Sequence, residues 1–161
     1  MRTEWRVERR AGFTLVELVV VMVIAVVLLG LTVPNFVKIT ARHQFESAAR
    51  RMVADIRETR ERVKTENTSY EILFLAAADR YNIKRYDNLS VTVRQRVQLP
   101  AQVDLVYAAF GGSGNVLRFN AYGEPNWNGT VTLKNRLTGE MCYVIVSQTG
   151  RVRVSNVPAA D

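Results

Sequence analysis

Residues 10–33 read RAGFTLVELVVVMVIAVVLLGLTV, and this segment sets the architecture expected for the whole chain. From Phe13 to Val33 the only charged residue is Glu17. A helix of this length would extend about 31 Å, close to the roughly 30 Å hydrocarbon core of a bilayer. Arginines at positions 2, 6, 9 and 10 precede it, which favours a cytoplasmic N-terminus and a C-terminal part on the far side. We therefore predict a single membrane span at residues 13–33.

The junction between the charged and the apolar segment differs from an ordinary secretory signal. Such a signal ends its apolar region with a small-residue A-x-A site, whereas this run continues into Thr32-Val33-Pro34-Asn35. The junction itself, from Arg10 to Leu18, resembles the class III leader of type IV prepilins, which is cut between a glycine and an aromatic residue. This resemblance implies that a prepilin peptidase cleaves between Gly12 and Phe13 and methylates the new Phe13 amine. Residues 1–12 would then be a leader peptide.

Glu17 is a candidate functional residue because a carboxylate in a lipid-embedded helix is costly and usually has a partner. The resemblance to prepilins implies that Glu17 meets the N-terminal amine of Phe13 on a neighbouring subunit during filament assembly. The alternative is a side chain that simply reaches the nearby interface, which its shallow position permits.

A second helical pattern follows the span. Apolar residues recur at intervals of three and four from Val37 to Val63, and arginines fall between them. Residues 34–64 are therefore predicted to form an amphipathic helix outside the membrane. Joined to the span, it would make a stalk of about 78 Å, with a kink near Gly30 and Pro34. Pro34 also matches a proline that many pilins carry at this distance from the cleavage site.

Residues 65–161 are expected to form a β domain. Short stretches rich in β-branched and aromatic residues alternate with Gly and Asn, which is typical of strands. The predicted strands are Tyr70–Ala76, Tyr81–Tyr86, Leu89–Leu99, Val103–Tyr107, Val116–Asn120, Thr130–Leu133, Met141–Ser147 and Val152–Ser155. Alternation predicts that Val91, Val93 and Val97 lie on a buried face. The predicted fold class is α+β, with the long N-terminal helix packed on an antiparallel sheet.

The order of motifs in the β region resembles the C-terminal domain of the GspH and FimT families. These families are minor pseudopilins and minor pilins. The residues that carry the resemblance are Leu117 to Pro125, Gly129 to Leu133, Val144 to Val146, and Gly150 to Val152.

Two kinds of major subunit fit the chain less well. Its single cysteine, Cys142, cannot form the C-terminal disulfide usual in major type IVa pilins. After Glu140 the only acidic residue is Asp161, too few oxygen ligands for the calcium loop of many major pseudopilins. The resemblance thus implies a minor subunit of a type II secretion pseudopilus or a type IV pilus. Its partners would be prepilin peptidase, other pilin subunits, the inner-membrane assembly platform and membrane lipid.

DNA binding for uptake is a second predicted function. The sequence from Gly150 to Arg153 resembles the GRxR element of DNA-capturing FimT-like pilins, and strand alternation places Arg151 and Arg153 on one side. Both could contact phosphates, and the basic residues at positions 118, 134 and 136 (Arg118, Lys134 and Arg136) would widen the patch. From Lys38 onward, 18 basic and 12 acidic residues leave a charge of +6. The alternative is that Gly150 forms a turn and the arginines are a solvated strand face.

An enzymatic function is disfavoured, and we expect neither a cofactor nor a metal site. One cysteine and one histidine cannot form a Cys/His metal cluster, and no serine or acid is placed to form a triad with His43. Cys142 lies in an apolar strand, and Gly111–Gly114 lacks the lysine of a phosphate-binding loop. A third interpretation is a generic single-span membrane anchor carrying a β domain, which would keep its leader.

Overall fold

The computed structural model describes residues 13–87 and 90–158, without the side chains of residues 30–35. One long helix, α1 (Leu15–Glu66), comes first in this described part and the strands follow it. They are β1 (Ser69–Leu75), β2 (Arg80–Asp87), β3 (Ser90–Gln98), β4 (Val103–Phe110), β5 (Val116–Phe119), β6 (Gly129–Asn135), β7 (Met141–Val146) and β8 (Val152–Ser155). Short 3-10 helices, η1 (Ala76–Ala78) and η2 (Gly111–Ser113), follow β1 and β4. Every strand predicted from the sequence is present.

The chain divides into two compact units, residues 1–37 and residues 38–161. In the first unit, the described side chains from Phe13 to Leu29 are all exposed. The helical assignment runs without a break through Gly30 and Pro34, and the kink expected at Pro34 stays a prediction. Within the residues that the structure describes, no helix is both long enough and apolar enough to cross a membrane.

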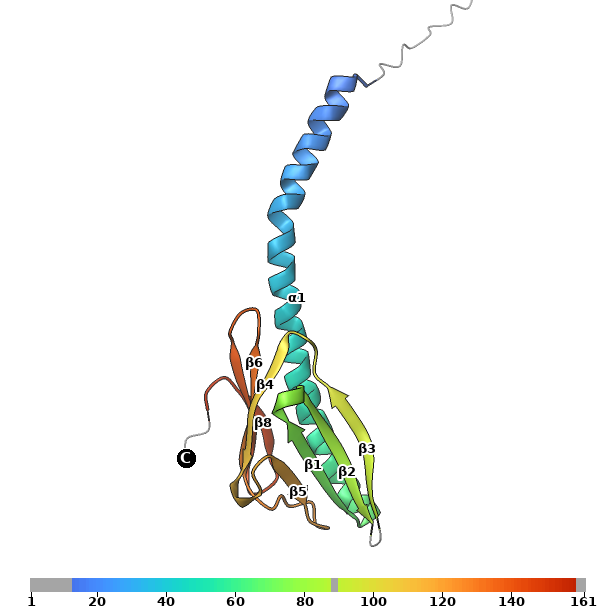
Figure 1. Cartoon of the computed structure of the whole chain (residues 1–161), viewed down its shortest axis with the longest axis vertical. Helices are drawn as coiled ribbons and strands as arrows, with labels where there is room; N and C mark the ends of the chain where they lie inside the picture. The colour runs from blue at the N-terminus through green and yellow to red at the C-terminus, as the bar shows by residue number, and fades with distance from the viewer. Residues whose placement is uncertain (1–12, 88–89, 159–161) are drawn as a thin grey trace, which may run out of the picture. The chain divides into compact units, whose positions relative to one another are not determined.

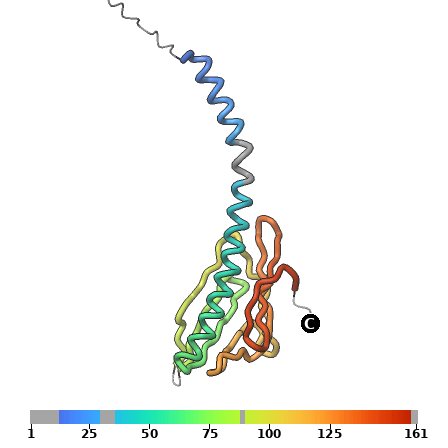
Figure 2. The backbone as a smooth tube through the Cα atoms, turned by 180° about the vertical axis from the view of Figure 1, so that it is seen from behind, coloured from blue at the N-terminus to red at the C-terminus, as the bar shows by residue number. Residues whose placement is uncertain are grey.

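The second unit is built around the second half of α1, which lies alongside both sheets with β1–β3 on one side and β6–β8 on the other (Figures 1 and 2). The apolar stripe predicted for this part of the helix faces the core. Its buried members are Ala41, Phe45, Ala48, Met52, Ile56, Thr59 and Val63, joined by Ala49 and Val53. Burial of this stripe, rather than helix propensity alone, holds α1 on the sheets.

The end of α1 is set by a left-handed residue. Asn67 has a φ of 47°, a conformation that asparagine tolerates better than most side chains. The Thr68 N–H donates to the Val63 carbonyl at 3.4 Å, which is the 6→1 hydrogen bond of a Schellman motif. The chain can therefore turn directly from the helix into β1.

The strands form two antiparallel sheets of four. Their orders are β3-β2-β1-β5 and β4-β6-β7-β8. Phe74 of β1 stacks on Phe110 of β4 with ring centroids 5.5 Å apart, which joins the two sheets through the core. Phe74 also contacts Tyr81 of β2 at 5.9 Å. The predicted α+β fold, a long N-terminal helix on antiparallel sheet, is confirmed.

One expectation about the sheet was wrong. Val97 is buried as predicted, but Val91 and Val93 are 54% and 43% exposed. The cause is a register shift, because Ile83 pairs with Gln95 whereas its neighbour Lys84 pairs with Val93. This bulge adds one residue to β3 and turns the strand over, so that Val91 and Val93 point away from the core.

Candidate functional site

The expected processing and assembly residues lie at the start of α1. Gly12 is outside the described residues, whereas Phe13 is described and is 84% exposed. Thr14 Oγ1 accepts a hydrogen bond from the Glu17 N–H at 3.2 Å, and the Leu18 N–H donates to the Thr14 carbonyl at the same distance. Thr14 is therefore the N-cap residue of the helix.

The Thr14 cap makes helix capping a second candidate role for the Glu17 side chain, which the sequence interpretation did not consider. Thr14-Leu15-Val16-Glu17 has the T-x-x-E spacing of a capping box, and a carboxylate at this position also interacts favourably with the helix dipole. The signal was present in the sequence. Glu17 thus has two candidate roles, helix capping and pairing with an amine.

The second candidate site begins with the hairpin between β7 and β8. The Gly150 N–H donates to the Ser147 carbonyl at 2.8 Å, and the Ser147 N–H donates to the Arg151 carbonyl at 2.9 Å. Gly150 has a φ of 76°, which favours glycine. The turn expected at Gly150 is thus present. Arg151, just before β8, and Arg153 within it are exposed, whereas Val152 between them is 2% exposed.

Two arginines of α1 hold this hairpin from the other side. Arg57 donates to the Val152 carbonyl at 2.8 Å. Arg60 donates through Nε to the Gly123 carbonyl at 2.9 Å and through its terminal nitrogen to the Thr149 carbonyl at 3.3 Å. These carbonyls neutralise no charge, so both guanidinium groups keep their full positive charge beside β8.

The four arginines line a single groove between α1 and β8, which we call the arginine groove. Its lining residues are Arg57, Arg60, Glu61, Thr149, Gly150, Arg151, Val152 and Arg153. Within the described part of the chain, none of its four arginines forms an ion pair with a carboxylate. The acid of the groove, Glu61, is 3.1 Å from Lys64 Nζ. Sequence reasoning missed Arg57 and Arg60 because only the fold brings them to β8.

The other basic residues expected near this patch lie elsewhere. Arg118 belongs to the other sheet, where it donates to Glu71 at 2.7 Å and lies over the Tyr86 ring at 5.3 Å. Arg136 pairs with Asp79 and with Asp104. Lys134, on β6, is not among the residues that line the groove. Arg118 and Arg136 are therefore engaged by acids outside the groove, and the widening of the patch by Lys134 stays a prediction.

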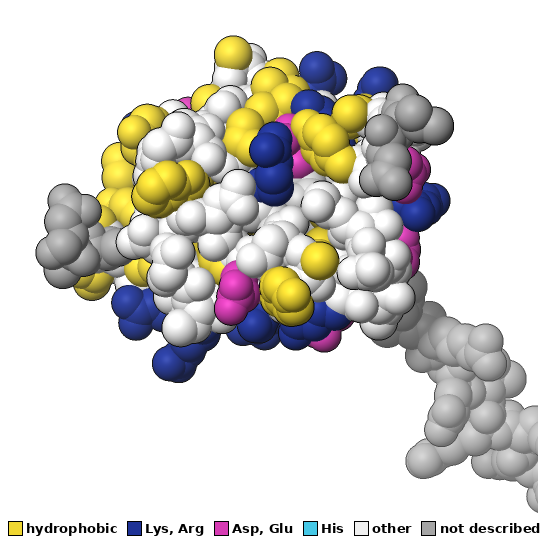
Figure 3. Space-filling view, turned by 90° about the horizontal axis from the view of Figure 1, so that it is seen from below, with side chains coloured by type: hydrophobic (Ala, Val, Ile, Leu, Met, Phe, Trp, Pro, Cys, Tyr) yellow, Lys and Arg dark blue, Asp and Glu magenta, His cyan; other side chains and the backbone are white. Residues whose placement is uncertain are grey.

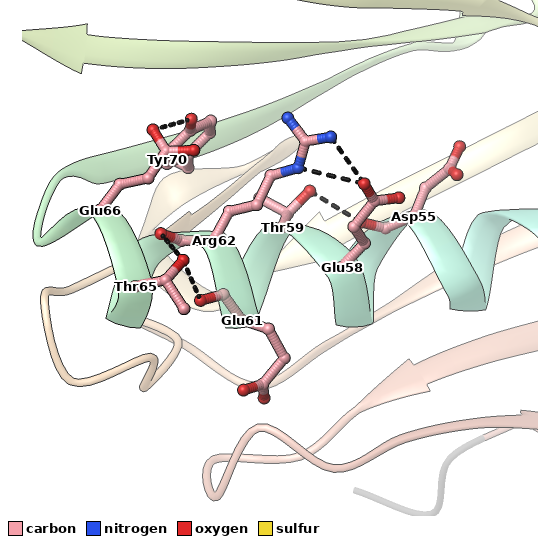
Figure 4. A network of polar contacts seen from close by, with 8 residues as sticks. All are labelled: Asp55, Glu58, Thr59, Glu61, Arg62, Thr65, Glu66 and Tyr70. Atoms are coloured by element: carbon pink, nitrogen blue, oxygen red, sulfur yellow. Dashed lines mark hydrogen bonds and ion pairs between the residues drawn. The ribbon is translucent and has the colours of Figure 1, made fainter.

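Other polar side chains of α1 stabilise the fold (Figure 4). Arg62 donates to Glu58 at 2.6 Å, and the Tyr70 hydroxyl donates to Glu66 at 2.8 Å. The Tyr81 hydroxyl donates to Asp55 in the core, and burial together with this bond raises the pKa of Tyr81. The two tyrosine bonds fix α1 to β1 and β2, whereas the Arg62–Glu58 bond lies within the helix.

The remaining candidate reactive residues are poorly placed for chemistry. Cys142 is 4% exposed, and burial together with the charge of Glu140 raises the pKa of its thiol to about 11, so the thiolate is scarce. His43 is exposed on α1. Among the described residues, no group of three His, Cys, Asp or Glu side chains is placed to hold a metal ion.

Comparisons with known proteins found a sequence motif at the N-terminus and a similar fold over most of the chain. The family described as the prokaryotic N-terminal methylation motif matches residues 8–33. No curated protein sequence matches the chain. The minor pseudopilin EpsH from the type 2 secretion system of Vibrio cholerae has a similar structure, with a TM-score of 0.61 and 12% identity over 70% of this chain and 96% of that one. The type IV minor pilin FimU of Pseudomonas aeruginosa gives a TM-score of 0.57 and 18% identity over 73% and 92%. This chain therefore carries the N-terminal methylation motif and has the fold of minor pilins and pseudopilins.

Proposed function

We propose that the protein is a minor subunit of a type IV pilus or of a type II secretion pseudopilus. The observation that carries this proposal is the methylation motif at residues 8–33 joined directly to α1, whose second half packs on two sheets in the minor pilin fold. The precursor sits in the inner membrane through residues 13–33. Prepilin peptidase removes residues 1–12 and methylates Phe13. The mature subunit then enters a filament whose core is a bundle of such helices.

The roles of the chain in this function are mechanical. The exposed apolar face from Phe13 to Leu29 first contacts lipid and then neighbouring helices in the filament. Glu17 pairs with the Phe13 amine of an adjacent subunit, which compensates the cost of its burial. The β domain stays outside the membrane. Its partners are other pilin subunits and the assembly platform.

The first test is the intact mass of the membrane-extracted protein from cells that contain the cognate prepilin peptidase. The expected species begins at a methylated Phe13. Gly12→Ser should leave an uncut chain, whereas the matched variant Ala11→Ser should be processed normally. A wild-type chain that keeps Met1 would contradict the proposal and would favour a generic membrane-anchored β domain.

DNA binding for uptake is a second candidate function, favoured by the arginine groove. The groove brings Arg57 and Arg60 of α1 to the Gly150-to-Arg153 element, and four guanidinium groups without carboxylate partners in the described chain attract phosphates. On the face drawn in Figure 3, Lys and Arg side chains lie along the lower edge together with some acidic ones, and others lie at the upper edge and in the centre.

The DNA candidate is tested by binding of a labelled DNA to the full-length protein in detergent at several salt concentrations. Affinity should fall steeply with salt, and Arg151→Ala/Arg153→Ala should reduce both the affinity and the salt slope. Arg96→Ala, which removes an exposed arginine of β3, serves as the control. Equal binding by the double variant and by this control would count against the candidate.

A further inference from the structure

An exposed aromatic ring is held on a rigid turn between β5 and β6. Tyr122 is 81% exposed. Asn120 Oδ1 accepts hydrogen bonds from the N–H groups of Tyr122 and Glu124, each at 3.0 Å. The Gly123 N–H donates to the Asn120 carbonyl at 2.8 Å, and the Asn120 N–H donates to the Glu124 carbonyl at 3.0 Å. Four hydrogen bonds thus fix the backbone on both sides of Tyr122.

This turn adjoins the arginine groove. The Gly123 carbonyl accepts the 2.9 Å hydrogen bond from Arg60, which also bonds the Thr149 carbonyl across the groove. A Cβ placed on Gly150 would lie 3.3 Å from the same Gly123 oxygen. Arg60 therefore ties the Tyr122 turn to the β7–β8 hairpin, and Tyr122 directly precedes the residue that Arg60 binds.

The charges around Tyr122 favour an anionic ligand. Two acids lie nearby, and their bonds differ in kind: Glu61 lines the groove and pairs with the Lys64 ammonium, whereas the amide that donates to Glu124 is neutral and does not offset its charge. Glu124 accepts from Asn120 Nδ2 at 3.1 Å, and Glu61 accepts from Lys64 at 3.1 Å. Within the described residues, none of the four groove arginines pairs with a carboxylate. A ligand that carries phosphates would satisfy them.

The exposed Tyr122 ring favours a single-stranded over a double-stranded nucleic acid as the ligand. In a duplex the faces of the bases are stacked on one another, whereas a single strand offers unstacked bases to an aromatic side chain. Proteins that bind single strands combine a basic groove along the backbone with aromatic rings on which bases stack. The arginine groove offers the first component and the exposed Tyr122 ring the second, and the hydrogen bond from Arg60 to the Gly123 carbonyl joins the two.

We propose that the arginine groove and Tyr122 bind single-stranded nucleic acid, with phosphates on Arg151 and Arg153 and a base stacked on Tyr122. This inference rests on the DNA-binding candidate and deepens it by naming the class of strand. Arg57 and Arg60 have a positioning role in this proposal. Arg57 binds β8 at Val152, and Arg60 binds both the hairpin and the Tyr122 turn, so they set the distance between Tyr122 and the two phosphate-binding arginines.

The test measures fluorescence anisotropy of a labelled oligothymidine 20-mer and of a 20-bp duplex with full-length protein in detergent. Tyr122→Ala should weaken single-strand binding about 5- to 150-fold, the range expected for loss of one stacked base, and leave duplex binding unchanged. Tyr122→Phe keeps the ring and should bind as wild type. Tyr107→Ala removes another exposed tyrosine, 61% exposed on β4, and is the matched control.

The outcomes separate this inference from the function on which it rests. If neither DNA is bound, the DNA-binding candidate fails and this site fails with it. If binding depends on Arg151 and Arg153 but not on Tyr122, or if the duplex binds as tightly as the single strand, the candidate stands and the single-strand inference is overturned. Unchanged circular dichroism of the Tyr122 variants verifies that the fold is intact.

Discussion

The guanidinium of Arg57 on α1 donates a 2.8 Å hydrogen bond to the carbonyl oxygen of Val152 on β8. In an antiparallel pair of strands, hydrogen-bonded and non-hydrogen-bonded residue pairs alternate. Ser147 and Arg151 form a hydrogen-bonded pair, so the next pair, Val146 and Val152, is not hydrogen-bonded, and the N–H and C=O groups of Val152 point away from β7. Val152 therefore lies on the free edge of the sheet, where an unpaired carbonyl would invite another strand. Arg57 closes this edge with a side chain of the helix.

Loss of the Arg57 side chain should weaken the attachment of β8 to the helix. Arg57→Ala is expected to lower the free energy of unfolding by about 1.5–3 kcal/mol, the range for a hydrogen bond that involves a charged group. The measurement is urea unfolding of the full-length protein in detergent, followed by circular dichroism. Arg50→Ala, whose side chain is 79% exposed in a 3.7 Å ion pair, should cost less than about 1 kcal/mol. Equal costs for both variants would contradict the role assigned to Arg57.

Gly150 should be far less tolerant of a side chain than Gly139, although their φ angles are 76° and 74°. A Cβ at Gly150 would lie 2.9 Å from Arg60 Nε, whereas a Cβ at Gly139 meets nothing within 4 Å. Gly139→Ala should therefore cost only the conformational strain, about 1 kcal/mol. Gly150→Ala should cost about 1–2 kcal/mol more, because moving Arg60 breaks its hydrogen bonds.

A double-mutant cycle isolates the contact between Gly150 and Arg60. In an Arg60→Ala background the collision is removed, so Gly150→Ala should cost no more than Gly139→Ala does in wild type. Urea unfolding of wild type, of both single variants and of the double variant gives the midpoints and slopes from which the coupling energy follows. A coupling of zero would mean that the intolerance at Gly150 comes from backbone conformation alone.

Local patterns predicted most of the fold. The helical stripe from Ala41 to Val63 and the eight strands are repeating signals in neighbouring residues, and these were confirmed. The error at Val91 and Val93 came from one extra residue in β3, which no alternation count reveals because the bulge depends on the pairing with β2.

The candidate sites were predictable only in part, for the same reason. Arg151 and Arg153 share one face by alternation, but Arg57 and Arg60 reach β8 through contacts across about 90 residues of chain, which only tertiary packing creates. In the sequence, Arg118 looked as able to bind a phosphate as Arg151. In the structure it donates a hydrogen bond to Glu71, a buried residue on the adjacent strand. Charge in a sequence does not reveal which arginines are already paired.

Glu71 should make the stability of the β domain depend on pH. Its carboxylate is 4% exposed; burial raises the pKa, but hydrogen bonds from Arg118, Tyr86 and Lys84 outweigh burial and lower the pKa below 4.5. Because the folded pKa is the lower one, the stabilisation is complete above the unfolded pKa. It is lost as pH falls through the folded pKa.

The variant Glu71→Gln tests this dependence on pH. It should cost about 1–3 kcal/mol of unfolding free energy near pH 7, and the difference from wild type should shrink below about pH 4.5. Glu58→Gln, at a side chain 57% exposed, is the control and should show little effect at any pH. A cost for Glu71→Gln that stays constant down to pH 3 would assign the effect to packing instead of charge.

Glu17 has two candidate roles, and they can be separated by substitution. Glutamine can serve in a capping box as glutamate does, but it cannot form an ion pair with the Phe13 amine. If the negative charge of Glu17 is needed, Glu17→Gln and Glu17→Ala should both be cleaved normally, and both should be depleted from filaments. The measurement is an immunoblot that compares the amount of each variant in sheared filaments with its amount in the membrane. Thr14→Ala removes the cap, whose hydrogen bond to the Glu17 N–H is 3.2 Å long, and keeps the charge, so it should assemble normally. If Glu17→Gln assembles as wild type while Glu17→Ala and Thr14→Ala do not, the side chain at position 17 acts as a helix cap, and pairing of a carboxylate with the Phe13 amine is refuted.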